Sequence, residues 1–239
     1  MKVVVIIPAA GLGTRMTTAR RGKKAPSKQF TELAGTPILL HTLRKFAASP
    51  EVAEIFVALR KDEINSFRTR LEKEGKDILQ KNIQLVEGGE HRQQSVANAL
   101  AAVKAAVDDI ILVHDAVRPF VTAEIIQEVV QGVKKHGAAI AGLPAVDTIK
   151  QVERTADAAI IKATVPREKI VMAQTPQGFR YDVIKKAFDQ ATADGFIGTD
   201  EASLVEHSEH EVAVVMGSTR NIKITTPADL ELAEFFLKR

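Results

Sequence analysis

Short apolar runs and longer amphipathic windows alternate between residues 3 and 143, and this alternation restricts the fold more than any other feature of the sequence. The apolar runs predict strands at 3–8, 55–59, 83–86, 110–114 and 138–143. The windows between them predict helices at 36–49, 62–75, 95–107 and 122–136. Strands that alternate with helices form mostly parallel sheets covered on both faces, so we expect a Rossmann-like α/β fold.

Residues 144–172 depart from this pattern. Two β-prone runs, 146–152 and 160–165, flank the polar stretch 153–157 with no long helix between them. They predict an antiparallel β-arm that protrudes from a single domain covering residues 1–239. Because a two-stranded arm is marginally stable by itself, we expect it to pack on a second copy in a homodimer. The remaining chain predicts helices at 182–194, 200–207 and 228–238, and a strand at 212–216.

Composition excludes several classes of protein. The chain has no cysteine, which removes disulfide frameworks, zinc ribbons, iron–sulfur clusters and thiol nucleophiles. Its net charge of +3 is too small to predict a nucleic-acid partner. No apolar run approaches the roughly 18–20 residues that span a bilayer, and the first residues lack the pattern of a signal peptide. We therefore expect a cytoplasmic protein that binds neither nucleic acid nor membrane.

Three loops follow predicted strands, at 8–15, 88–95 and 115–120, where α/β sheets bind ligands. The first is rich in small residues, which let backbone N–H groups approach an anion. It lacks the small residue that a dinucleotide fingerprint needs in place of Met16, and Thr17 and Lys24 break the P-loop pattern. The cations Arg15 and Lys28 suit a triphosphate, although the spacing equally fits a tight turn with surface charges.

An ordered set of motifs gives a more specific indication. The set is Pro8-Ala9-Ala10-Gly11-x-Gly13-x-Arg15-Met16, Pro26-x-Lys28-Gln29-Phe30, Gly88-Gly89-x-x-Arg92-x-x-Ser95-Val96, His114-Asp115-Ala116-x-Arg118-Pro119, Asp147-Thr148-Ile149-Lys150, Gln174-Thr175-Pro176-Gln177, Thr199-Asp200-Glu201-Ala202 and Asn221-Ile222-Lys223-Ile224-Thr225. Over essentially the whole chain, it resembles the 2-C-methyl-D-erythritol 4-phosphate cytidylyltransferase family of the non-mevalonate isoprenoid pathway. The resemblance implies transfer of CMP from CTP to that polyol phosphate, with release of pyrophosphate. It also implies a homodimer and Mg²⁺ held mainly by the CTP phosphates.

The resemblance also implies roles for individual residues. Phosphoryl-type transfer depends on positioning and on cations aimed at the developing charge. The residues that match catalytic positions are Arg15, Lys28 and Lys223. Those that match polyol-phosphate contacts are Asp115, Arg118, Thr148, Lys223 and Arg167, the last reaching in from the partner's arm. Those that match nucleotide contacts are Ala9, Ala10, Gly11, Gly13, Gly88, Gly89 and Ser95. Ser95 also stands at a plausible helix N-cap. No His/Asp cluster has metal-ligand spacing, so no protein ligand to a metal is predicted.

Other readings remain open at this stage. The acceptor could be another polyol phosphate, such as ribitol 5-phosphate, because a few pocket contacts decide between alcohols. The chain could be a non-catalytic nucleotide-binding protein, although Arg15, Lys28 and Lys223 together favour an enzyme. An oxidoreductase is a further alternative. The basic insert at 17–25 is either a mobile flap over the triphosphate or a solvated loop.

Overall fold

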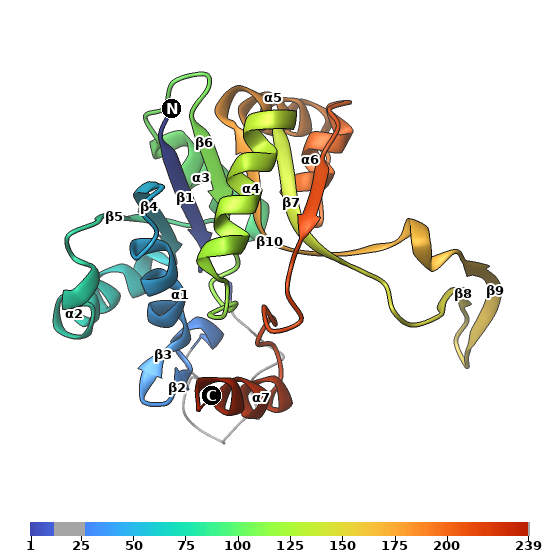
Figure 1. Ribbon diagram of the computed structural model, residues 1–239, viewed down its shortest axis with the longest axis horizontal. Coiled ribbons are helices and arrows are strands. Elements are labelled where there is room, and N and C mark those ends of the chain that lie inside the picture. Colours follow the sequence, from blue (N-terminus) through green and yellow to red (C-terminus); the bar gives the residue numbers. More distant parts are fainter. Residues whose placement is uncertain (12–26, 239) are drawn as a thin grey trace.

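A seven-stranded sheet forms the centre of the computed structural model, which describes residues 1–11 and 27–238 (Figure 1). Its strand order is β11-β7-β10-β6-β1-β4-β5. All neighbours pair in parallel except β10, which is antiparallel to both β6 and β7. The strands are β1 Val3–Pro8, β4 Val52–Leu59, β5 Asn82–Glu87, β6 Ile110–Val113, β7 Ala138–Pro144, β10 Val171–Arg180 and β11 Ala213–Met216. The mostly parallel sheet predicted from the sequence is confirmed.

Helices cover both faces of the sheet, because successive residues of the buried strands point to opposite sides. Val3, Val5 and Ile7 of β1 belong to one core, whereas Val4 and Ile6 belong to the other. On the first face lie α1 Ile38–Ala47, α2 Ile64–Glu74 and α4 Ala123–His136. On the second lie α3 Arg92–Ala102, α5 Tyr181–Asp194 and α6 Glu201–His207. None of these helices, nor any other in the described ranges, has the length and apolar character to cross a membrane.

A smaller apolar cluster contains Leu33, Ile38, Val117, Ile224 and Ala233. There α7 Pro227–Leu237 packs beside the hairpin of β2 Glu32–Leu33 and β3 Thr36–Pro37. Thr226 caps α7 by accepting the Asp229 N–H, and Pro227 follows it at the first helical position. Short 3-10 helices occur at Lys28–Phe30, Lys61–Glu63, Lys76–Ile78 and Arg167–Lys169.

Two local predictions were wrong. The helix expected at 95–107 runs instead over α3 Arg92–Ala102, and Ser95 is not its N-cap. The Ser95 hydroxyl donates to the His91 carbonyl and accepts the Gly89 N–H, so it already lies within the first turns. At the other end, Val103 takes an extended conformation and stays buried, which ends the helix before the alanine-rich tail.

The second error is β10 Val171–Arg180, because no strand was predicted between the arm and the helix at 182–194. Its polar residues Gln174, Thr175 and Gln177 are buried, because each forms hydrogen bonds to neighbouring segments. Gly178 is required here, since a Cβ atom would lie 2.7–2.9 Å from the side chains of α4 and β6. β10 therefore carries polar side chains into the middle of the sheet, where hydropathy patterns do not reveal a strand.

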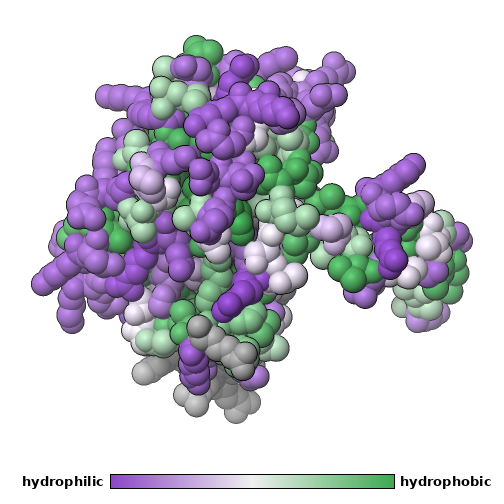
Figure 2. All heavy atoms as spheres, in the orientation of Figure 1, coloured by the Kyte–Doolittle hydropathy of each residue, from purple (hydrophilic) through white to green (hydrophobic). Residues whose placement is uncertain are grey.

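The expected arm is present as the antiparallel pair β8 Ile149–Arg154 and β9 Ala159–Val165. It projects from the ends of β7 and β10, away from the rest of the chain (Figure 1). Apolar side chains lie exposed on it, including Val152, Ile160 and Ile161 at 40%, 50% and 60% exposure. Figure 2 shows such hydrophobic side chains on the arm and its connection to the body. Within one chain, nothing in the described residues covers them.

Candidate active site

A pocket lies where β1, β5 and β6 end at one edge of the sheet. Its lining includes residues 8–11 at the end of β1 and residues 115–117 after β6. After β5 it includes Gly89, Glu90, His91, Arg92 and Ser95. Lys28, Gln29 and Lys223 complete it. Its empty volume, which includes space open to solvent, is about 560 Å³. The three loops predicted from the strand pattern therefore meet at one place.

A second cavity adjoins this pocket and shares Arg92, Asp115 and Lys223 with it. Its other lining residues come from β10, from the segment before α6 and from the loop after β6: Ala173, Gln174, Thr175, Gln177, Thr199, Asp200 and Arg118. The three shared residues thus stand between two compartments. This arrangement suits two substrates that meet at a charged junction.

Small residues shape the first pocket. The Gln29 amide donates to the Ala9 carbonyl at 2.6 Å, and the Ala9 N–H donates to the Ala58 carbonyl, so this turn is held on both sides. Ser95 fixes the Gly89 N–H at 3.0 Å. Gly88 does not line this pocket but lines an open groove that adjoins the pocket at Gly89. Of the predicted nucleotide-binding residues, Ala9, Ala10, Gly11, Gly89 and Ser95 line the pocket, whereas Gly13 lies outside the described residues.

If this pocket binds the CTP that the motifs lead us to expect, Gly88→Ala should weaken that binding. A Cβ atom at this position would lie 2.6 Å from the Ala10 Cβ and 3.0 Å from the Ser95 Oγ, so the β1 loop must shift. Overpacking of this kind costs about 1–3 kcal/mol. The KM for CTP should rise about tenfold or more, as measured by initial rates. Gly195→Ala, at a distant helix end, serves as the control for a general loss of stability. An unchanged KM in Gly88→Ala would contradict the prediction.

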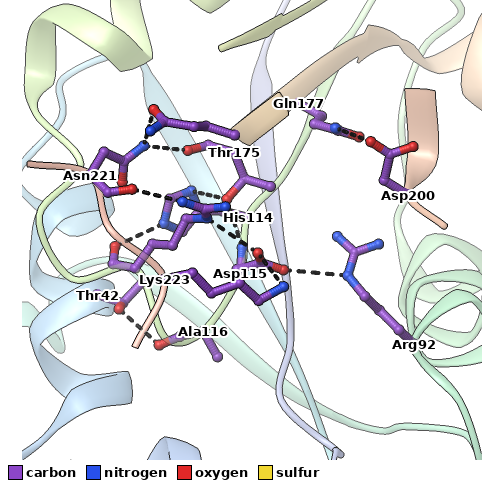
Figure 3. Close-up of polar contacts among 12 residues, drawn as sticks. Thr42, Arg92, His114, Asp115, Ala116, Thr175, Gln177, Asp200, Asn221 and Lys223 are labelled. Atoms are coloured by element: carbon purple, nitrogen blue, oxygen red, sulfur yellow. Dashed lines mark hydrogen bonds and ion pairs between the residues drawn. The ribbon is translucent and has the colours of Figure 1, made fainter. Parts of the chain in front are cut away.

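Asp115 is the centre of the charged junction (Figure 3). Its carboxylate lies 2.9 Å from the Lys223 Nζ, 3.3 Å from the Arg118 Nε and 3.4 Å from the Arg92 Nε. Burial alone would raise the pKa of Asp115, but the charges of Arg92, Lys223 and Arg118 outweigh it and hold this pKa well below its usual range. Asp115 is therefore ionised at neutral pH and acts as an anchor for cations rather than as a proton acceptor.

A buried histidine orients the neighbouring backbone. The His114 Nε2 lies 3.0 Å from the Arg118 carbonyl, which can only accept, so this nitrogen carries the proton. The Nδ1 must then accept the Thr175 hydroxyl at 3.1 Å, and the Thr175 Oγ1 in turn accepts the Asp115 N–H at 3.1 Å. The chain of hydrogen bonds has one consistent direction. It ties β10 to the loop that carries Asp115.

We predict that His114 makes folding sensitive to acid. Burial lowers its pKa from 6.5 to about 4. Between these values the unfolded chain binds a proton that the folded chain excludes. The stabilisation is thus fully present above pH 6.5 and is lost as pH falls towards 4, a change of about 3 kcal/mol. Urea unfolding of the natural protein and of His114→Gln should show a stability difference that shrinks across this window. A difference that stays constant would contradict the assignment.

The arrangement of these residues agrees with comparisons to known proteins. The model of the IspD family, described as 2-C-methyl-D-erythritol 4-phosphate cytidylyltransferase, matches residues 3–239. The chain belongs to the IspD family. It is therefore a cytidylyltransferase, and the reaction expected from its motifs, transfer of CMP from CTP to 2-C-methyl-D-erythritol 4-phosphate in isoprenoid synthesis, is that of its family. None of the relatives found favours ribitol phosphate as the acceptor.

Four similar proteins match over nearly their whole length. The 2-C-methyl-D-erythritol 4-phosphate cytidylyltransferase of Acidobacterium capsulatum is 56% identical, with 100% of this chain and 98% of the relative covered. That of Solibacter usitatus is 52% identical, with 100% and 96% covered. The crystal structure of 4-diphosphocytidyl-2C-methyl-D-erythritol synthase from Anaerococcus prevotii has a TM-score of 0.83 at 30% identity, covering 100% of this chain and 99% of that one. The Thermus thermophilus cytidylyltransferase has a TM-score of 0.77 at 33% identity, with both chains fully covered.

Not all residues expected in this IspD-family site line its two cavities. Thr148 and Arg167 are exposed on the arm and line neither cavity. The Arg167 guanidinium donates to the Val146 carbonyl at 2.9 Å. Arg15 and the basic insert 17–25 lie outside the described residues. Conversely, Arg92 and Glu201 belong to quoted motifs but had no predicted role, and an ion pair of 2.7 Å now joins them.

The described residues offer no protein cage for a metal ion. No group of three or more histidine, cysteine or acidic side chains there could hold one. In the pocket, both oxygens of the Asp115 carboxylate already face cations. Mg²⁺ often keeps its waters and binds through substrate phosphates, a mode that needs no protein cage.

Proposed function

We propose that this pocket binds CTP, that the adjoining cavity receives 2-C-methyl-D-erythritol 4-phosphate, and that CMP transfer takes place at the junction between them. An oxygen of the acceptor phosphate forms a bond to the α-phosphorus of CTP. The bond from that phosphorus to the bridging oxygen breaks, and pyrophosphate leaves. The observation that carries this proposal is the cluster of Lys223, Arg92 and Arg118 on one buried carboxylate, between two cavities.

Charge explains why such a cluster suits the reaction. Two phosphate-bearing substrates repel each other, so they approach only where fixed cations neutralise them. Lys28 and Lys223 line the CTP pocket and Arg118 lines the acceptor cavity. Preorganised cations stabilise the charge that develops on the departing pyrophosphate without further rearrangement. We assign the transition-state contacts to Lys28, Lys223 and Arg15, and acceptor contacts to Asp115, Arg118 and Lys223.

The cytidine end depends on the backbone. Ala9, Ala10, Gly11, Gly13, Gly88 and Gly89, with the Ser95 hydroxyl, are assigned to the base, ribose and phosphates. Small residues leave room for a pyrimidine and bring N–H and carbonyl groups close to its edge. A Cβ atom at position 88 would lie 2.6 Å from the Ala10 Cβ, so only glycine fits beside this turn without a shift.

The arm completes the site in a homodimer. A free two-stranded arm with exposed apolar side chains gains stability when a second copy covers it. In a two-fold dimer each arm meets the equivalent surface of its partner. We propose that Arg167 and Thr148 thereby reach the acceptor phosphate bound by the other copy. Light scattering on the purified protein should give twice the mass of 26.0 kDa, and a monomer would contradict this part of the proposal.

Mg²⁺ enters the proposal as a companion of CTP. When bound, it neutralises charge on the triphosphate and the leaving group. The protein's own residues hold the nucleotide and the acceptor. Because both substrates are soluble phosphorylated metabolites, we also place the enzyme in the cytoplasm.

The test is initial-rate pyrophosphate release with Mg²⁺. CTP, UTP, ATP and GTP are each paired with 2-C-methyl-D-erythritol 4-phosphate and with ribitol 5-phosphate. We expect turnover with CTP and the methylerythritol phosphate. Turnover with ribitol phosphate alone would retain the nucleotide site but overturn the acceptor assignment. No release from folded protein with any pair would overturn the proposed function.

A further inference from the structure

Glu201, the first residue of α6, is a buried carboxylate to which the proposed function gives no role. Its side chain is 1% exposed. One oxygen accepts the Arg92 Nη1 at 2.7 Å, and the other has no hydrogen-bond partner in the described part of the chain. A buried carboxylate is costly unless it is well paired, and an apolar residue often fills such a place more stably. Burial raises the pKa of Glu201, whereas the charge and hydrogen bond of Arg92 oppose this rise, so the negative charge here depends on the ion pair with Arg92.

Glu201 ends a series of alternating charges that leads to the reacting centre. Arg92 bridges Glu201 at 2.7 Å and Asp115 at 3.4 Å. Asp115 in turn holds the Lys223 Nζ at 2.9 Å. The order is thus Glu201, Arg92, Asp115, Lys223. Its two end contacts are short and the central one is long, so Arg92 is drawn towards α6 and away from Asp115.

We infer that Glu201 is a positioning residue for Lys223: by holding Arg92 on the α6 side, it keeps one oxygen of Asp115 available to the lysine. The inference rests on the proposed function, because the position of Lys223 matters for catalysis only if this pocket performs the transfer. Glu201 lines neither cavity and therefore acts through Arg92.

The geometry of arginine gives the reason. A guanidinium fits a carboxylate with two parallel hydrogen bonds, whereas lysine contacts it as a point charge. Without the charge of Glu201, the Arg92 fork would turn to Asp115 and compete with Lys223 for its oxygens. Arg92 contacts the Asp115 Oδ1, whereas Lys223 and the Arg118 Nε share the Oδ2 at 2.9 and 3.3 Å. The Arg118 Nη1 is fixed by the Asn221 carbonyl at 2.7 Å, so Arg118 stays in place whether or not Glu201 is charged.

The backbone of α6 does not depend on Glu201. The Gln177 side chain donates to Asp200 at 2.7 Å and accepts the Ala202 N–H at 3.0 Å. Asp200 and Ser203 form a capping box at the start of the helix. Replacing the Glu201 carboxylate with an amide should thus leave the helix in place and alter only the charges around Arg92.

Glu201→Gln tests this inference. We expect kcat to fall about tenfold or more, because small misplacements of a catalytic group have large effects on rate. The KM for CTP should change little, since the nucleotide contacts remain. The matched control is Glu51→Gln. Glu51 also has a buried carboxylate oxygen without a hydrogen-bond partner in the described residues. It precedes β4, however, at the end of that strand away from the pocket. Its kcat should equal that of the natural protein.

A double-mutant cycle separates positioning from general stability. In an Asp115→Asn background, Lys223 has lost its carboxylate anchor, so Glu201→Gln should cause no further fall in kcat. If the losses of kcat in the two single variants multiply in the double variant, the inference is wrong. It is also wrong if Glu201→Gln keeps the kcat of the natural protein. If Glu201→Gln fails to fold, Arg92→Lys replaces it in the cycle, because one ammonium cannot bridge both carboxylates. Turnover by the natural protein and its loss in Lys223→Ala test the proposed function separately.

Discussion

Lys223→Ala should lower kcat about a thousandfold, the largest effect of any single substitution considered. Lys223 lines the nucleotide pocket and the adjoining cavity, and its ammonium lies 2.9 Å from Asp115. A cation fixed at the point where charge develops contributes about 10²–10³ in rate, and Lys223 faces both the attacked and the departing phosphate in our proposal. The loss should appear in kcat as well as in kcat/KM, measured by pyrophosphate release.

The folded state should tolerate this substitution. The Lys223 side chain is 36% exposed, and Asp115 keeps Arg92 and Arg118 as partners. Lys185→Ala on the exposed face of α5 provides a matched lysine control, since Lys185 pairs with Asp189 far from the pocket. Suppose that Lys223→Ala has the same thermal midpoint as Lys185→Ala and also keeps the activity of the natural protein. Lys223 would then have no role in the mechanism.

Two inactive variants should restore activity when they are mixed. Arg167→Ala alone is expected to lower kcat/KM about a hundredfold, through loss of a phosphate contact from the partner's arm. In a heterodimer of Arg167→Ala with Lys223→Ala, one site combines an intact Lys223 with an intact Arg167 from the other chain. After random exchange of subunits, about a quarter of the natural activity should return.

The control for this experiment keeps both defects in one chain. The double variant, Arg167→Ala with Lys223→Ala, is mixed with the single variant Lys223→Ala. No dimer in this mixture contains an intact Lys223, so the activity should stay at the level of the separate variants. If the first mixture also stays inactive although light scattering shows dimers, Arg167 does not serve the partner's site. Sites would then be complete within one chain, and Arg167 would act in the site of its own chain.

The sequence predicted much of the fold because its buried strands are continuous apolar runs. β1 and β6 are buried on both faces, so every residue in them had to be apolar, and the pattern is unambiguous. β10 escaped prediction for the opposite reason, since Gln174, Thr175 and Gln177 are buried through hydrogen bonds formed by residues far away in sequence. A hydropathy pattern does not reveal that these hydrogen bonds offset the cost of burying polar side chains.

The candidate site could be predicted only in part. The rule that ligands bind at the carboxyl ends of parallel strands located the loops after β1, β5 and β6. The role of Arg92 could not be read in the same way, because its partner Glu201 is 109 positions away along the chain. Ser95 was mistaken for a helix cap because serine is common there, whereas its hydroxyl lies one turn further along the helix.

The central claim concerns where the reaction takes place, and the most direct measurement is a crystal structure of the protein with CTP and Mg²⁺. Our account predicts electron density for cytosine beside Gly89 and Ser95, with the phosphates between Lys28 and Lys223. Density for the nucleotide in the neighbouring open groove, on Arg60 and Lys61, would contradict it. That outcome would leave the charged junction around Asp115 without the substrate that we assign to it.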